Sequence, residues 1–117
     1  MNDVLDQLNR VRGVGGSLLV SSEGLVMASA LRSGIDENQI AASLGTLLEG
    51  ATKIAQVFQL GKIAAFNAGS DQGGMVLVST GPAFLAIIVD ASANLALLQL
   101  ETKPFVERIT QRLTLKT

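Results

Sequence analysis

The sequence predicts one α+β domain in which a five-stranded antiparallel sheet is covered by helices on both faces. Three observations support this prediction. Amphipathic helical segments alternate with short extended runs, the extended runs are apolar at most positions, and glycine-rich reversals separate several of them. Strands that are apolar at most positions are usually covered on both faces. A chain of 117 residues fits one compact domain, so residues 1–117 are treated as a single unit.

A short helix and a hairpin come first. The helix is predicted over residues 3–11 by apolar residues at three- and four-residue steps, namely Val4, Leu5, Leu8 and Val11. Two apolar runs follow, at residues 17–20 and 25–31, and they flank the polar tetrad at 21–24. We interpret this tetrad as the turn of a hairpin, because its Gly24 can supply the positive φ that such turns require.

Residues 36–60 carry the strongest helical pattern in the chain. Asp36 can cap this helix, and Glu37 lies favourably near the positive end of the helix dipole. One broad apolar stripe is expected to lie on the sheet: Ile40, Leu44, Leu47, Leu48, Ala51, Ile54, Ala55 and Phe58. The opposite face is small or polar, and its Glu49 and Lys53 are spaced for an ion pair between residues four apart.

Three further strands are predicted after Gly61. They are separated by the reversals Gly69-Ser-Asp-Gln-Gly-Gly74 and Gly81-Pro82, which suit tight turns, and so form an antiparallel meander. The strands are expected at residues 62–68, 75–80 and 83–89.

The tail has helical spacing that Pro104 interrupts. Because proline breaks or kinks a helix at the residue before it, we expect one helix near residues 93–102 and another near 104–114. A strand at residues 96–100 is the alternative for the first of these segments.

Composition excludes several classes of function. The chain has no cysteine and no histidine, which removes thiol nucleophiles, imidazole bases and the commonest transition-metal ligands. The net charge of −1, with neither Trp nor Tyr for base stacking, argues against nucleic acid as a partner. The longest apolar run, residues 83–89, is too short to cross a membrane, and residues 1–13 do not resemble a secretory signal. We therefore expect a cytoplasmic protein.

Neither a cofactor site nor a catalytic site is predicted. The cluster Gly13, Gly15 and Gly16 lacks the lysine and the preceding strand of a phosphate-binding loop. A hydrolase without histidine would need a carboxylate dyad or a Ser-Lys pair, and the candidate serines have no lysine nearby in the sequence. We expect a protein that is not an enzyme and that binds no metal and no cofactor.

Two stretches resemble the Roadblock family, the domain type of the dynein roadblock light chains. The first is VRGVGGSLLVSSEGLVMAS from Val11, which looks like the opening helix-turn-hairpin of that family. The second is AIIVDASANLALLQLE from Ala86, which is similar to its last strand and the start of its final helix. Ala96 departs from the pattern, because bacterial and archaeal members often carry glycine there.

The resemblance implies a sheet order of 2-1-5-4-3, with the long helix on one face and the terminal helices on the other. It also implies dimers in which the long helices pack antiparallel and the third strands pair. Two features of the residues agree with this. Ala42 and Gly45 leave a shallow strip on the long helix, and the strand at 62–68 would be an edge strand with one charge, Lys62. The predicted interface residues are Ala42, Gly45, Thr46, Glu49, Lys53, Gln56, Lys62, Ala64 and Phe66.

The expected function is that of a non-catalytic homodimeric adaptor that binds a small Ras-like GTPase and modulates its nucleotide cycle. The resemblance implies such partners. The arginines available as a finger in trans are Arg10, Arg12, Arg32, Arg108 and Arg112, and none stands in a motif that marks it. The alternatives are a structural scaffold subunit with no GTPase partner and a sensor domain for a small ligand.

Overall fold

A computed structural model describes residues 1–115, and these residues form three helices and five strands. The order α-β-β-α-β-β-β-α matches the prediction. In chain order the elements are α1 (Asn2–Leu8), β1 (Val14–Ser21), β2 (Val26–Ala30), α2 (Glu37–Val57), β3 (Ala65–Ser70), β4 (Gly73–Ser79), β5 (Ala83–Asp90) and α3 (Leu95–Leu115).

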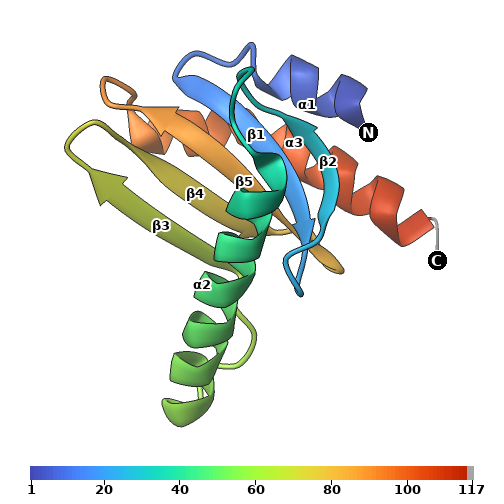
Figure 1. The fold of residues 1–117 in the computed structure, drawn as a ribbon, viewed down its shortest axis with the longest axis vertical. Coiled ribbons are helices and arrows are strands. Elements are labelled where there is room, and N and C mark those ends of the chain that lie inside the picture. The colour runs from blue at the N-terminus through green and yellow to red at the C-terminus, as the bar shows by residue number, and fades with distance from the viewer. Residues whose placement is uncertain (116–117) are drawn as a thin grey trace.

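The five strands form one antiparallel sheet in the order β2-β1-β5-β4-β3, which confirms the predicted order. The helix α2 crosses one face, and α1 and α3 cover the other (Figure 1). Successive side chains of a strand point to opposite faces. On β1, accordingly, Leu19 belongs to the core beneath α1 and α3, whereas Leu18 and Val20 belong to the core beneath α2.

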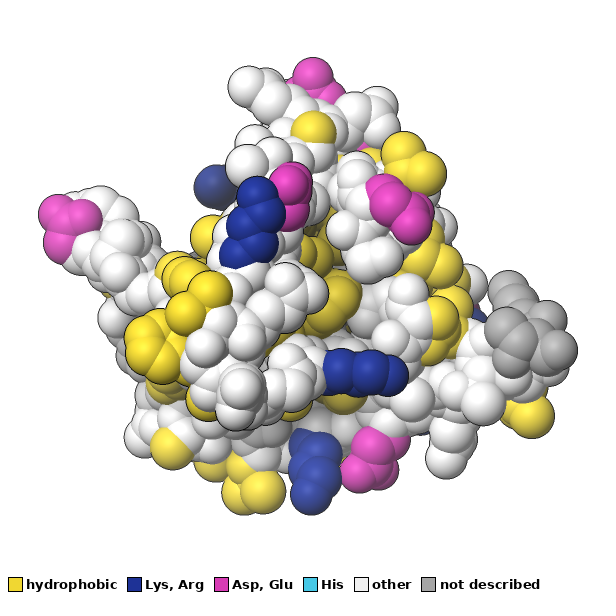
Figure 2. Space-filling view, turned by 90° about the horizontal axis from the view of Figure 1, so that it is seen from below, with side chains coloured by type: hydrophobic (Ala, Val, Ile, Leu, Met, Phe, Trp, Pro, Cys, Tyr) yellow, Lys and Arg dark blue, Asp and Glu magenta, His cyan; other side chains and the backbone are white. Residues whose placement is uncertain are grey.

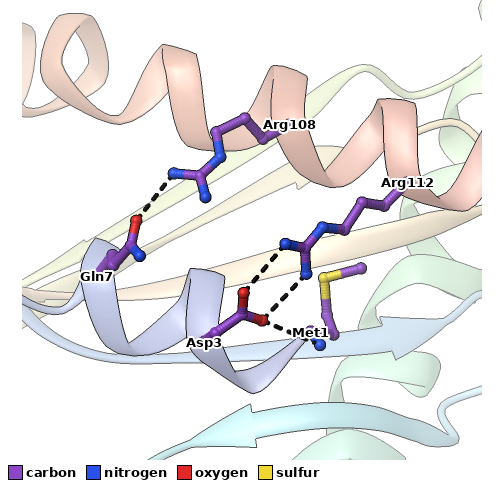
Figure 3. Close-up of polar contacts among 5 residues, drawn as sticks. All are labelled: Met1, Asp3, Gln7, Arg108 and Arg112. Carbon is purple, nitrogen blue, oxygen red and sulfur yellow. Dashed lines mark hydrogen bonds and ion pairs between the residues drawn. The ribbon is translucent and has the colours of Figure 1, made fainter.

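The face beneath α1 and α3 is called the closed face, because helices cover it and its core is large. Its fully buried side chains include Leu5 and Leu8 from α1 and Ile109 from α3. Polar contacts join the two helices at their outer edges (Figure 3). Arg112 donates to both carboxylate oxygens of Asp3 at 3.0 Å, and Arg108 donates to the side-chain oxygen of Gln7 at 2.9 Å.

The face beneath α2 is called the open face, because α2 covers only part of it. The residues of α2 that are buried in the core of the open face are Ala41, Leu44 and Leu48, and Ala55 is buried nearer the end of the helix. The expected apolar stripe is wrong at its end, since Ile54 is 59% exposed and Phe58 is 70% exposed. A helix of 21 residues is about 31 Å long, and the last turns of α2 extend beyond the sheet (Figure 1).

The start of α2 is held as the sequence predicted. The carboxylate of Asp36 accepts hydrogen bonds from the backbone N–H groups of Asn38 and Gln39 at 3.1 and 3.2 Å. These bonds satisfy two of the N–H groups that a helix leaves unpaired in its first turn. In addition, Ser29 of β2 donates a hydrogen bond to Glu37, which ties the beginning of α2 to the sheet.

Several predicted boundaries are wrong. The first helix ends at Leu8 and not at residue 11, and the first strand begins at Val14 and not at residue 17. The tail forms one helix over Leu95–Leu115 with Pro104 inside it, instead of two helices or a strand. Pro104 is exposed, so the carbonyl of Leu100, which loses its helical hydrogen bond, lies on the solvent side of α3. The third strand begins at Ala65, so Lys62 and Ala64 lie in the loop before it. Strand β3 itself carries no charged residue.

Candidate interaction surfaces

The six predicted interface residues on α2 line a groove against the tip of the β1–β2 hairpin. The groove has a volume of about 720 Å³. Viewed from the end of α2, it is a hollow with hydrophobic side chains on its floor and charged side chains at its rim (Figure 2). Its lining comprises Ser22, Glu23, Gly24, Leu25, Ala42, Gly45, Thr46, Leu48, Glu49, Thr52, Lys53, Gln56 and Phe84.

Gly45 and Gly24 bring α2 and the hairpin into backbone contact beside this groove. A Cβ added at Gly45 would lie 3.0 Å from the Cα of Gly24 and 3.2 Å from the carbonyl oxygen of Glu23. Gly24 has φ +88°, which confirms its predicted role in the turn. The sequence interpretation of Gly45 needs correction, because the close approach that it allows is made by the chain's own hairpin.

The charges around the groove differ in their partners. Glu49 and Lys53 form the predicted ion pair, with 3.5 Å between the lysine Nζ and a carboxylate oxygen. Both side chains are exposed, so this pair contributes little stability. Glu23, at the hairpin tip, is exposed and forms no ion pair with any residue in 1–115. The hairpin tip was interpreted from the sequence only as a turn, but it also contributes a charge to the rim of the groove.

The other predicted interface residues lie at the opposite edge of the sheet. Among residues 1–115, β3 pairs with β4 on one side, and no strand pairs with its other side. Phe66 of β3 is half-buried and packs against the core of the open face. Lys62 and Ala64 are exposed in the loop that connects α2 to β3. The predicted interface is thus divided between two surfaces on different sides of α2 (Figure 1).

A third set of residues lies on the side of α2 that faces β3, and the sequence interpretation had assigned two of them, Leu47 and Ile54, to the sheet. With about 100° of rotation per residue, Leu47, Gly50 and Ile54 lie roughly opposite Gly45 on the helix. We call these three residues the edge side of α2. A Cβ at Gly50 would have no atom within 4 Å. The sequence did indicate this surface, because the apolar stripe on α2 is wider than packing against one face of the sheet requires.

The family of the chain follows from comparison with known proteins. Residues 1–89 match the Roadblock/LC7 domain. The chain belongs to the Roadblock/LC7 family. Among curated proteins, an uncharacterised protein of Methanocaldococcus jannaschii is 29% identical over 106 residues, covering 91% of this chain and 93% of that protein. A second uncharacterised protein of the same organism is 28% identical over the same length.

Solved structures share the fold of this Roadblock/LC7 domain. MglB of Myxococcus xanthus superposes with a TM-score of 0.90 at 19% identity, covering 97% of this chain and 94% of the other. A Roadblock/LC7 domain from Streptomyces avermitilis has a TM-score of 0.87 at 20% identity, with 97% and 98% coverage. At these identities the likeness establishes the fold.

Two arginines of this Roadblock/LC7 domain lie on the closed face, away from the groove. Arg108 and Arg112 are engaged by α1 on the closed face, and within residues 1–115 no arginine lines the groove. The Arg112 guanidinium, through its hydrogen bonds, holds the pKa of Asp3 well below its usual range. The structure through residue 115 also shows no group of acidic side chains suited to a metal ion. None of the helices in that part is long and apolar enough to span a membrane.

Proposed function

We propose that this Roadblock/LC7 domain is a non-catalytic homodimeric adaptor that binds a small Ras-like GTPase and modulates its nucleotide cycle. The observation that carries the proposal is the incompleteness of one side of the molecule. The uncharged edge of β3 lies beside the edge side of α2, and the apolar side chains at the end of that helix face solvent. Such an edge is open to pairing with another strand, and exposed apolar patches mark interaction sites.

A second copy of the chain fits this side. Pairing of two β3 edges by a two-fold axis would continue the sheet and bring the two edge sides of α2 together. Phe66 and Met75, which are half-buried on the open face, would then gain cover. Gly50 has open space above it and would allow a second helix to approach closely. The groove against the hairpin lies on the other side of α2 and stays free for a different partner.

Family membership supports a Ras-like GTPase as that partner. Because no arginine among the described residues lines the groove, the proposed effect works by positioning. The dimer would order the partner's own catalytic loops in one conformation, and an arginine supplied in trans would not be needed. The scaffold alternative uses the same dimer without a GTPase.

The dimer is tested by light scattering on a matched pair of variants. Wild type is expected at twice 12.2 kDa at tens of micromolar protein. Gly50→Arg, on the edge side, places a charge in the proposed helix contact and is expected at the monomer mass. Thr52→Arg introduces the same side chain on the groove side of α2 and is expected to remain a dimer. A monomeric wild type, or equal masses for the two variants, would contradict the proposed interface.

The partner is tested with purified Ras-like GTPases from the source organism, loaded with GDP or with a non-hydrolysable GTP analogue. Binding is expected to depend on the bound nucleotide, and Thr52→Arg is expected to weaken it at least tenfold. The hydrolysis rate is expected to change by less than the ~10³-fold that an arginine finger supplies. If no such GTPase binds in either nucleotide state, the scaffold function replaces the proposed one.

A further inference from the structure

The groove between α2 and the hairpin tip combines an apolar surface with one unpaired acid. Leu48 and Phe84 contribute apolar surface to its lining, and Leu25 is 66% exposed there. A leucine this exposed next to a concave apolar surface is a candidate contact for a partner's side chain. The volume of about 720 Å³ lies within the range of roughly 300–1,000 Å³ in which proteins bind ligands.

The backbone of Glu23 is held against α2, although its side chain is exposed. The carbonyl oxygen of Glu23 lies at the contact between Gly24 and Gly45, so the backbone at the hairpin tip is fixed against α2. The hairpin turn is closed by a hydrogen bond from the Gly24 N–H to the Ser21 carbonyl at 3.0 Å. A carboxylate on a fixed backbone loses less freedom when it binds a cation than one on a mobile loop.

The other acid at the groove is already neutralised. Glu49 is paired with Lys53, whereas Glu23 has no ion-pair partner in the described chain. The lining therefore carries two acids and one base, and the remaining negative charge is centred on the hairpin tip beside Leu25. A complementary partner surface would present a positive charge next to an apolar side chain.

We propose that the groove recognises a segment of a partner protein in which a large apolar side chain stands next to Lys or Arg. The apolar side chain lies on Leu25, Leu48 and Phe84, and the basic side chain pairs with Glu23. This inference deepens the proposed function and rests on it to the extent that the GTPase supplies the segment. The apolar contact provides most of the affinity, and the Glu23 pair provides the choice between basic and acidic segments.

The probe is a phage-displayed library of random twelve-residue peptides selected on the full-length wild-type protein. Selected peptides are expected to share Leu, Phe or Met next to Lys or Arg. Affinities are then measured by fluorescence polarisation with labelled copies of these peptides. Glu23→Lys is expected to weaken binding at least tenfold, and Leu25→Ser is expected to weaken it several-fold. Asp71→Lys makes the same charge change in the exposed β3–β4 turn and is expected to bind like wild type.

The results separate the inference from the function on which it rests. A library that yields no binders, peptides without basic residues, or equal losses for Glu23→Lys and Asp71→Lys would each overturn the inference. A GTPase that binds wild type and Glu23→Lys equally would also overturn it while leaving the proposed function standing. Selected peptides that require Glu23, in a protein that binds no GTPase, would support the inference and overturn the function.

Discussion

The two faces of the sheet differ in how much apolar surface one chain buries on them, and the closed face has the larger core. On the closed face, α1 and α3 cover the sheet, and the apolar side chains of α1 are fully buried. On the open face, a single helix crosses the sheet and continues past it, which leaves Ile54, Val57 and Phe58 exposed. The core of the closed face is buried within one chain, although α3 exposes Leu95, Leu97 and Leu100 on its outer side. The open face leaves the apolar end of α2 in solvent, where the proposed second copy would cover it.

Because of this difference, we expect the closed face to contribute mainly to the stability of the fold and the open face to contribute mainly to recognition. Burying apolar surface is the main favourable contribution to folding, and the closed face achieves it without a partner. The open face keeps apolar surface that contributes nothing to the isolated chain and can stabilise a complex. Substitutions of similar size should therefore affect the free energy of unfolding on one face and assembly on the other.

The largest expected effect is the loss of stability from a truncation on the closed face. Leu5→Ala removes a fully buried side chain and is expected to lower the free energy of unfolding by about 2–5 kcal/mol. Ile54→Ala on the open face is expected to change it by less than about 0.5 kcal/mol. Both are measured by urea unfolding in the Gly50→Arg background, so that dimer formation does not add to the stability.

For the dimer dissociation constant, the order of the two truncations should be reversed, with the larger effect at Ile54. With position 50 unchanged, Ile54→Ala is expected to raise the dimer dissociation constant, whereas Leu5→Ala is expected to leave it unaltered as long as the chain is folded. Equal losses of stability for the two truncations would show that Ile54 is buried within the isolated chain. The contrast between the faces would then be wrong.

A smaller effect is expected at the two glycines of α2. Replacing glycine by alanine inside a helix gains roughly 1 kcal/mol of helix propensity. At Gly50 a Cβ would meet open space, so Gly50→Ala is expected to stabilise the monomer by about that amount. At Gly45 the Cβ would press on the hairpin backbone, so Gly45→Ala is expected to destabilise it by up to about 2 kcal/mol, since overpacking costs ~1–3 kcal/mol.

The comparison uses thermal and urea unfolding at concentrations where light scattering shows monomers. Gly45→Ala is also expected to weaken peptide binding in the groove, because the hairpin must move to admit the Cβ. Stabilisation of similar size by both alanines would show that the hairpin is not held against α2. The groove would then lose the fixed wall on which its proposed selectivity depends.

The sequence predicted the elements and their order because local patterns determine them. The cap at Asp36, the turn at Gly24 and the ion pair of Glu49 with Lys53 all depend on neighbours within four residues. Pro104 misled the prediction for a related reason. The cost of a helical proline falls when the carbonyl that loses its bond faces water, and a local pattern does not show which side of a helix faces water.

The candidate site was harder to predict because it joins distant segments. Ala42 and Gly45 were interpreted as a strip that another helix could approach, and the sequence did not show that the chain's own hairpin already occupies part of it. Ile54 was assigned to the sheet because helical periodicity gives the direction of a side chain and not the extent of the sheet beneath it. Glu23 gave no signal, since an acid in a turn is common.

The smallest effect is expected from the ion pair that joins the helices of the closed face. Arg112 stabilises the charged form of Asp3 through its hydrogen bonds, so the pKa of Asp3 in the folded protein lies below its ordinary value of 3.8. A carboxyl group with a lowered folded pKa contributes stability above its unfolded pKa and loses it as the pH falls toward the folded value. The contribution of Asp3 should therefore be present at neutral pH and decline below about pH 4.

Asp3→Asn is the variant that tests this, with Asp6→Asn as a matched change on the same helix. Asp6 is exposed and forms no ion pair with residues 1–115. Asp3→Asn should lower the midpoint of urea unfolding slightly at pH 7 and equal wild type in strong acid, and added salt should shrink the difference. A pH-independent difference would mean that Asp3 acts through packing. The buried side chains of α1 contribute more than this ion pair to holding the helix on the sheet, so α1 should stay in place in both variants. The mass of the dimer should not change.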